Sequence, residues 1–280
     1  MQESPEQSQF RLRFWGVRGS IPVSDAEMQA GGGDTACVEM RCGPHVLLFD
    51  AGSGLRRAGE VLAREGVTEF DLFLSHWHYD HIIGLPFFRP LMSEKSKAVI
   101  WAGHLDSKLA TKEAMAAFMR PPFFPVSPKM FQAAVVYRDF EPDDILKPRH
   151  GIIVRTARLK HPGGVIGYRV EYQGKACVYM TDIAAAGDEI DPRAADLAAH
   201  ADLLIYDCMY TDREVAEHGG YGHSTWQRAV RLCREAGVAR LALFHHAPER
   251  TDKALAKLES QARTEFPGAF AARSGKTLLL

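Results

Sequence analysis

The chain has 280 residues, of which 46% are hydrophobic and 25% are charged, and its formal net charge is -1. This composition is that of a soluble globular protein long enough to bury a large core. The balanced charge provides no strong positive field, which argues against tight binding to a long nucleic acid but leaves a small phosphate-bearing substrate open.

The cysteines and the N-terminal residues indicate in which cellular compartment the protein is expected. The five cysteines include no Cys-x-x-Cys pair, so we expect free thiols in a reducing, cytoplasmic setting. Residues 1–9 are polar and acidic, which predicts a disordered tail and no signal peptide. No stretch approaches the ~20 apolar residues of a membrane span, so we expect no membrane partner.

The first part of the chain is predicted to form strands over residues 10–17, 36–41 and 45–49. The last of these ends in the turn Asp50-Ala51-Gly52-Ser53-Gly54. Ser53 is placed to cap a helix over residues 55–65. Asp50 is equally consistent with a plain turn former and with a residue that supports a site.

The run Ser75-His76-Trp77-His78-Tyr79-Asp80-His81 is a dense cluster of metal-binding side chains. It follows the apolar segment 70–74, which is typical of a buried strand, so it lies on a loop that leaves a strand end. On extended backbone its first two histidines point the same way, whereas Asp80 and His81 come after the chain has begun to turn. One short loop can then provide two ligands to each of two metals, and these ligand types suit zinc, iron or manganese.

The motif His-x-His-x-Asp-His resembles the signature of the metallo-β-lactamase superfamily, and the resemblance extends over most of the chain. It implies an α/β fold of four layers, an αββα sandwich in which two mixed sheets pack face to face with helices outside. It also implies one or two metals at one edge of the sandwich. We find no linker or low-complexity segment, so we expect one domain over residues 1–280.

The resemblance assigns the remaining ligands of a first metal. His161 follows the alternating segment 152–159 and precedes a Pro-Gly turn. Beside the cluster it becomes the third imidazole of one site, together with His76 and His78. The Asp-x-Gly-x-Gly turn is also typical of the superfamily. It implies that Asp50 does not bind metal itself but supports the ligands of the metal loop, residues 75–81.

The carboxylate that bridges two metals is assigned to Asp182, which follows the strand-like segment 175–180. Asp207 is a rival because it also ends an apolar strand. We rank it lower, since the Thr181-Asp182 context matches the bridging position of the superfamily better.

The sequence Gly222-His223-Ser224-Thr225 precedes an amphipathic helix. Ser224 and Gln227 fit a capping box, which would hold His223 just before the helix N-terminus, where anions are attracted. There His223 can contact a phosphate and donate a proton. The alternative is an ordinary loop histidine near a cap.

The pair His245-His246 follows the apolar strand 240–244. We choose His245 as the ligand that completes the second metal, because it occupies the position that superfamily sequences use. His246 would then support a ligand or face the substrate.

Residues 103–150 are interpreted as an insertion near the edge that carries the site. A helix is predicted over 105–119, and the proline-rich, aromatic segment 123–128 follows it. That segment either forms a wall over the site or packs at the surface.

The resemblance implies two divalent metals, of which zinc is the first choice and manganese or iron the alternatives. They would share a bridging hydroxide that attacks the substrate, with Asp80 kept ionised and His223 as general acid. One metal would be held by His76, His78 and His161, and the other by Asp80, His81 and His245, with Asp182 between them.

The pairing of Asp182 with Gly-His-Ser-Thr resembles the phosphodiesterase branch of the superfamily, which includes tRNA 3′-processing endonucleases and cyclic-nucleotide phosphodiesterases. The endonucleases carry a long Gly/Pro-rich arm that this chain lacks between the two motifs, so we expect a small or cyclic phosphodiester and no long nucleic acid. Two alternatives stay open: a hydrolase of lactones, thioesters or carboxylic esters, and a di-iron redox protein, against which His78 argues. A purely structural zinc site is a third alternative, but such a site has four ligands and this chain offers more candidates than that. Relatives are often dimers, so a homodimer is also open.

Overall fold

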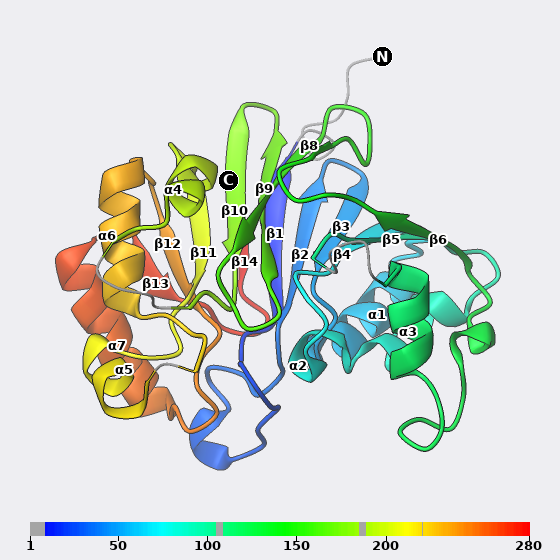
Figure 1. Cartoon of the computed structure of the whole chain (residues 1–280), viewed down its shortest axis with the longest axis horizontal. Helices are drawn as coiled ribbons and strands as arrows, with labels where there is room; N and C mark the ends of the chain where they lie inside the picture. Colours follow the sequence, from blue (N-terminus) through cyan, green and yellow to red (C-terminus); the bar gives the residue numbers. More distant parts are fainter. Residues whose placement is uncertain (1–8, 105–108, 185–188, 220) are drawn as a thin grey trace.

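Two seven-stranded β-sheets pack face to face in the computed structural model, which describes residues 9–104, 109–184, 189–219 and 221–280. Helices cover the outer face of each sheet, so the molecule has four layers (Figure 1). This arrangement confirms the predicted αββα sandwich. The predicted tail over residues 1–9 lies, apart from Gln9, outside the described residues.

The first sheet begins with antiparallel pairs and continues with parallel ones. Its strands, in spatial order, are β14 (Thr277–Leu279), β1 (Phe10–Gly16), β2 (Cys37–Cys42), β3 (His45–Phe49), β4 (Glu69–Phe73), β5 (Lys97–Ala102) and β6 (Ala134–Asp139). The parallel half places the carboxyl ends of β3, β4 and β5 at one edge, where ligands usually bind in such sheets.

The second sheet repeats this plan. Its strands, in spatial order, are β13 (Ala269–Ala271), β12 (Leu241–Phe244), β11 (Leu203–Asp207), β10 (Lys175–Met180), β9 (Val165–Tyr172), β8 (Ile153–Leu159) and β7 (Ile145–Leu146). Strands β10 to β13 are mutually parallel, whereas β7 to β10 alternate in direction.

The helices follow the strands on the outside. They are α1 (Gly54–Arg64), α2 (Tyr79–Ile82), α3 (Thr111–Phe118), α4 (Pro192–Ala198), α5 (Asp212–His218), α6 (Trp226–Ala236) and α7 (Asp252–Glu265). Short 3-10 turns are η2 (Ala26–Met28), η3 (Leu85–Phe87), η4 (Arg89–Met92) and η5 (Pro128–Met130). None of the helices in the described part of the chain is both long and apolar enough to cross a membrane.

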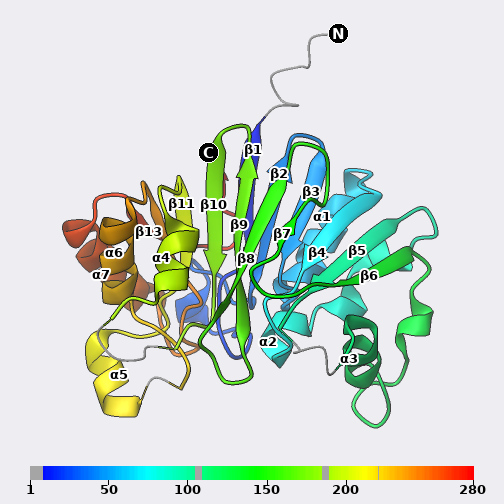
Figure 2. The same cartoon turned by 45° about the horizontal axis from the view of Figure 1, so that its top comes forward.

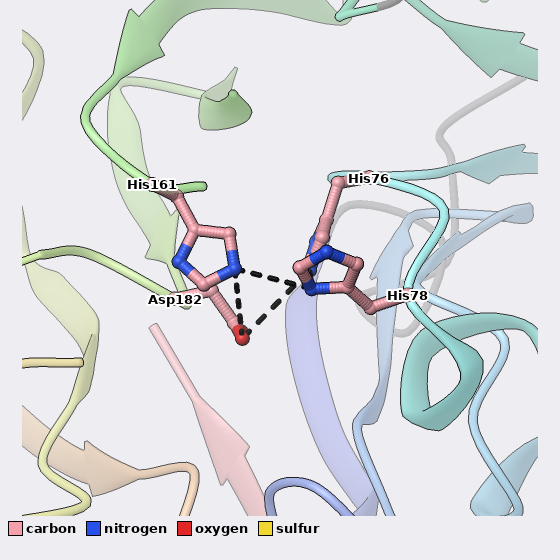
Figure 3. A group of neighbouring side chains, drawn as sticks. All are labelled: His76, His78, His161 and Asp182. Carbon is pink, nitrogen blue, oxygen red and sulfur yellow. Dashed lines mark hydrogen bonds and ion pairs between the residues drawn. The ribbon is translucent and has the colours of Figure 1, made fainter. Parts of the chain in front are cut away.

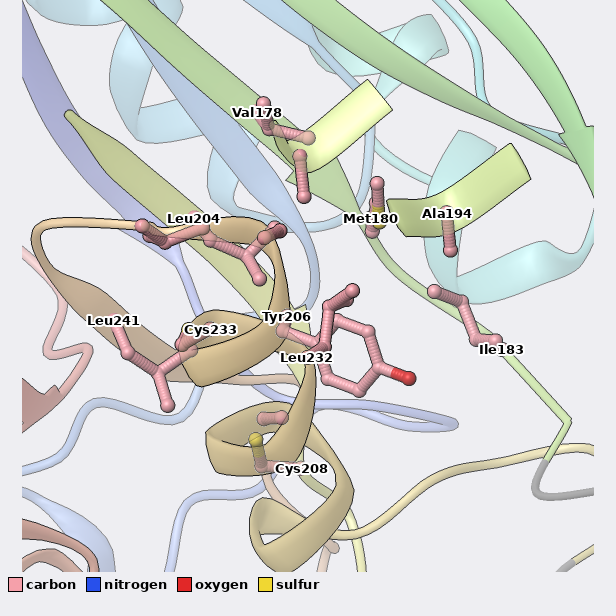
Figure 4. Packing of buried hydrophobic residues seen from close by; sticks show 14 of the residues in the cluster. Val178, Met180, Ile183, Ala194, Leu204, Tyr206, Cys208, Leu232, Cys233 and Leu241 are labelled. Carbon is pink, nitrogen blue, oxygen red and sulfur yellow. The ribbon is translucent and has the colours of Figure 1, made fainter. Parts of the chain in front are cut away.

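Three apolar clusters fill the spaces between the four layers. The central one, between the sheets, is rich in aromatic rings, and Phe49 stacks on Phe73 with ring centroids 5.1 Å apart. The outer clusters lie between each sheet and its helices, and Figure 4 shows the one beneath α4 and α6. All five cysteines are buried and unpaired, as the sequence predicts.

Two predicted helix caps differ from the observed ones. Ser53 does precede α1, but its hydroxyl donates to Asp34 and does not cap the helix. Helix α6 begins one residue later than the capping box requires, so the hydroxyl of Thr225 accepts from Arg228 N at 3.2 Å. Only Ser224 has the Gln that a capping box requires three residues later, whereas the observed cap Thr225 has Arg228 there and acts through its hydroxyl alone.

The helix predicted over 105–119 is shorter than expected. Helix α3 spans Thr111–Phe118, and the first part of the prediction falls on residues 105–108, outside the described residues. Thr111 is anchored by Asp139, which accepts from its backbone N–H at 2.8 Å. The helix therefore packs against the end of β6.

Candidate metal centre

The loops that carry the predicted site residues meet at one edge of the sandwich, and α2 lies at that edge in Figure 2. The run from Ser75 to His81 leaves β4 in the first sheet, whereas His161, Asp182 and His245 follow β8, β10 and β12 in the second. Ser75 joins the two sheets directly, because its carbonyl accepts from Ile166 N at 3.0 Å. The residues come together only because the two sheets pack face to face.

The first group of side chains consists of His76, His78, His161 and Asp182, which point toward one another in Figure 3. His76 Nε2 lies 2.9 Å from His78 Nδ1, and His161 Nε2 lies 3.2 Å from the same atom. Asp182 Oδ1 lies 3.8 Å from His76 Nε2 and 3.9 Å from His161 Nε2.

Two of the three rings in this group turn an acceptor nitrogen toward it. His76 Nδ1 contacts the hydroxyl of Ser75 at 3.0 Å, and that hydroxyl itself donates to Asp50. His161 Nδ1 donates to the carbonyl of Gly222 at 2.9 Å. In both rings the Nε2 lone pair is therefore directed into the group, which is the arrangement that a cation requires.

The second group consists of Asp80, His81, Asp182 and His245, all buried. His81 Nε2 lies 3.2 Å from Asp80 Oδ2 and 3.1 Å from Asp182 Oδ2. His245 Nε2 lies 3.3 and 3.2 Å from the same two oxygens. Asp182 thus turns one carboxylate oxygen to each group, which is the geometry of a bridging ligand.

These groups fit divalent metals. Tetrahedral ligands at about 2.0–2.1 Å from a zinc ion are about 3.3 Å apart, and most of the distances above lie near that value. The first group would use His76, His78, His161 and Asp182, and the second Asp80, His81, Asp182 and His245. When bound, the metals would activate a water as nucleophile and offset negative charge on the substrate.

The pKa shifts agree with this fit. Burial lowers the pKa of His76, His78 and His161, so these rings are neutral at pH 7, which is the form that binds metal. Burial opposes ionisation of Asp80, but His81 and His245 outweigh it and lower the pKa of that carboxyl.

His81 behaves differently. Burial lowers its pKa, but Asp80, Asp182 and Asp50 together raise it well above the ordinary value. Three carboxylates around one ring require positive charge at this point, which either a proton on His81 or a cation supplies.

Asp50 accepts hydrogen bonds from the metal loop, residues 75–81. Its Oδ2 accepts from His81 Nδ1 at 2.7 Å and from Tyr179 Oη at 2.7 Å. Both the hydroxyl and the backbone N–H of Ser75 donate to the same carboxylate, at 2.8 and 2.7 Å. This buried network sets the tautomer of His81, so that its Nε2 faces the second group.

His223 lines the cavity in front of both groups, with its Nδ1 3.8 Å from Asp182 Oδ1. Asp207 is its partner and accepts from His223 Nδ1 at 3.0 Å. Burial lowers the pKa of His223, but Asp207 and Asp182 outweigh it and raise that pKa to about 9. The sequence presents Asp207 as a rival to Asp182, whereas the structure pairs it with His223.

His246 is directed away from this edge. It is buried, and its Nε2 donates to the carbonyl of Ala272 at 2.9 Å. The contact lies at the end of β13, and His246 is not among the described residues that line the cavity. His245 instead carries the ring that completes the second group.

Two residues near the site are missed by sequence reasoning. Ser20 has a positive φ of 63°, lines the cavity, and donates its backbone N–H to Asp80 Oδ2 at 2.8 Å. His104 is buried after β5, with its ring centroid 6.4 Å from that of His76. In the sequence, the only feature that could have pointed to His104 is its position at a strand end. Ser20 acts through its backbone N–H, which no side-chain pattern reveals.

The comparisons with known proteins agree with this geometry. A family model described as the beta-lactamase superfamily domain matches residues 45–246, which contain all the side chains of both groups. The chain belongs to the metallo-β-lactamase superfamily. With relatives named ribonuclease Z, it is a hydrolase. Its two groups of histidine and aspartate side chains are the candidate divalent-metal site.

Individual relatives span nearly the whole chain. The ribonuclease Z of Myxococcus xanthus is 24% identical over 93% of this chain and 94% of its own length. The metallo-β-lactamase fold protein YhfI from Bacillus subtilis aligns with a TM-score of 0.73 at 20% identity, over 98% of this chain and all of that one. A diphosphatase from the PhnP family aligns with a TM-score of 0.70 at 17% identity, over 97% of each chain.

Proposed function

We propose that the chain hydrolyses phosphodiesters, with two divalent metals held by the two groups and His223 as the proton donor. The observation that carries this proposal is the position of His223, 3.8 Å from the carboxylate that both groups share. A protonated ring there can hydrogen-bond a phosphate oxygen and pass its proton to the leaving oxygen. The names of the relatives, a ribonuclease and a diphosphatase, support chemistry at phosphorus.

We propose further that the substrate is small. The cavity in front of the metal centre has a volume of about 630 Å³, and none of the described residues that line it is Lys or Arg. A long nucleic acid is normally held by several such cations along its backbone. The relatives named ribonuclease Z oppose this expectation, since that name belongs to an enzyme of RNA. Size of substrate is therefore a separate question from the reaction.

The reaction is tested by metal analysis together with hydrolysis of bis(p-nitrophenyl) phosphate. We expect close to two metals per chain, and cleavage that a chelator abolishes. Asp182→Ala removes a ligand from both groups, so kcat/KM should fall by at least about 100-fold, the upper end of the loss for outer partners of a metal site. Asp202→Ala is the matched control, because Asp202 pairs with Lys175 away from the site.

Other outcomes have clear meanings. Metal without diester cleavage, combined with turnover of a lactone or thioester, would refute the phosphodiesterase. Cleavage of a 3′-extended tRNA precursor at a higher kcat/KM than any small diester would refute the small substrate and keep the reaction. Occupancy unchanged in Asp182→Ala would refute the assignment of the bridging ligand.

A further inference from the structure

The cavity beside the metal centre has two unlike sides. One side is polar and presents Asp80, Asp182 and His223. The other is apolar and consists of side chains from two separate segments, the metal loop and the region around α3. Because both sides line the same cavity, a molecule bound at the metal centre also meets the apolar side.

Eight residues make up this apolar side, and we name it the aromatic wall. Its members are Trp77, Tyr79, Ile82, Leu109, Ala114, Ala117, Phe118 and Phe123. Tyr79 and Phe118 approach each other with ring centroids 6.3 Å apart, so the metal loop and α3 are in contact within the wall.

Two rings of the wall are far more exposed than the core requires. Tyr79 is 69% exposed and Phe123 is 74% exposed. Large aromatic side chains at the rim of a cavity, beside a polar site, are characteristic of ligand-binding surfaces. Neither ring belongs to the three apolar clusters of the fold, so packing of the core does not explain their placement.

The charge of the lining residues and the volume of the cavity limit which molecules can bind there. With neither Lys nor Arg among the described lining residues, the wall has no cation for a second phosphate. A volume of about 630 Å³ accommodates a molecule of nucleotide size, within the range of small-molecule sites. Flat, uncharged rings pack well on exposed aromatic side chains.

We infer that the aromatic wall binds a flat aromatic substituent of the substrate, either a nucleobase or an aryl group, while the phosphodiester lies at the metal centre. This inference rests on the proposed function and makes the substrate class more specific. Phe123 and Tyr79 are specificity-determining residues, and they take no part in the bond cleavage.

The test compares two diesters with the same leaving group, bis(p-nitrophenyl) phosphate and methyl p-nitrophenyl phosphate. Only the first retains an aromatic substituent after cleavage. Phe123→Ala should lower kcat/KM for the first by about tenfold relative to the second, since stacking of a ring is worth about 1–3 kcal/mol. Comparing each variant with the wild type removes the different intrinsic reactivities of the two diesters.

Phe87→Ala is the matched control. Phe87 is 56% exposed and contacts Phe124, but it does not line the cavity. It should leave the relative rates unchanged. If both diesters are cleaved and Phe123→Ala alters them equally, the aromatic wall is refuted and the phosphodiesterase stands.

A binding measurement covers the case in which neither diester is cleaved. Calorimetric titration of the metal-loaded protein with phenylphosphonate and methylphosphonate needs no turnover. Tighter binding of the phenyl compound that disappears in Phe123→Ala supports the wall even if the proposed reaction fails. Equal affinity for the two phosphonates overturns it.

Discussion

Two side chains of the metal centre, and the one that hydrogen-bonds His81 from outside it, are attached to backbone in the left-handed region. Asp50, Asp182 and His245 have φ values of 59°, 54° and 59°, and each follows the end of a strand. For residues other than glycine this conformation costs roughly 1 kcal/mol or more. It turns the chain sharply at the sheet edge, which directs each side chain into the site. For Asp50 and Asp182 the cost is offset by buried hydrogen bonds to their carboxylates, donated by Tyr179 and Thr181 respectively.

Asp50 should contribute strongly to stability because four donors depend on it. Asp50→Ala leaves the buried hydroxyl of Tyr179 and the N–H of Ser75 without their acceptor, so we expect a loss of about 3–5 kcal/mol in the free energy of unfolding. Tyr179→Phe removes one donor and should cost about 1 kcal/mol. Urea denaturation measures both, and equal losses would contradict the shared network.

The pH dependence of turnover should report the pairing of His223 with Asp207. Burial lowers the pKa of His223, but Asp207 raises it to about 9. The protonated donor is thus present through neutral pH, and activity should fall as pH rises through that value. In Asp207→Asn the attraction is lost, the pKa falls, and the alkaline limb should move to lower pH.

Asp202→Asn makes the same chemical change at the outer pair with Lys175, so it should leave the pH profile in place. If the alkaline limb does not move in Asp207→Asn, a group other than His223 is responsible for it. The quantity to compare is the position of the alkaline limb in Asp207→Asn relative to that in Asp202→Asn, because this difference does not depend on the absolute pKa.

At the scale of elements, α6 holds the loop that carries His223. The hydroxyl of Thr225 accepts from Arg228 N and donates to Asp212 Oδ1 at 2.5 Å, which ties the helix start to α5. The left-handed cap Gly237 ends the helix, with a φ of 68°. Its apolar face packs into the cluster beneath the second sheet.

Thr225→Ala should therefore destabilise the protein by about 1 kcal/mol, the usual value of an N-cap. Gln227→Ala is the informative comparison, since in a capping box its side chain would accept from the backbone N–H of Ser224, whereas here it accepts from the exposed N–H of Asp212 at 3.3 Å. We expect Gln227→Ala to stay within about 0.5 kcal/mol of the wild type. A larger loss for Gln227→Ala than for Thr225→Ala in urea denaturation would reverse the assignment.

At the scale of the whole molecule, the two sheets follow the same plan, with antiparallel strands at one side and parallel strands at the other. Each sheet contributes one set of strand-end loops to the shared edge. The first contributes the run from His76 to His81, and the second contributes His161, Asp182 and His245. The metal centre thus spans the interface between the two halves.

Metal removal should consequently lower the stability of the entire fold. A ligand that binds only the native state at 100 times its Kd stabilises it by about 2.7 kcal/mol. Chelation should lower Tm by roughly 5–10 °C for a chain of this size. In Asp182→Ala, which lacks the shared ligand, the chelator should produce a smaller shift in Tm. Identical melting with and without chelator would show that the groups hold no metal.

The sequence by itself determined the strands and the strand-end position of the site residues, because alternating segments predict strands, and clustered histidines and aspartates directly after them mark strand ends. For the same reason His161, Asp182 and His245 could be singled out, although their assignment also needed the resemblance. Spacing along the chain carries that information. The αββα sandwich and its metal-bearing edge came from the resemblance to the superfamily motif.

Only the tertiary structure decided which partners these residues meet. The pairing of Asp207 with His223, the burial of His246 against Ala272 and the two faces of Asp182 all join segments that are distant in sequence. The aromatic wall depends likewise on α3 packing beside the metal loop. Such contacts follow from how two sheets stack and where a backbone turns, and no local pattern encodes either of them.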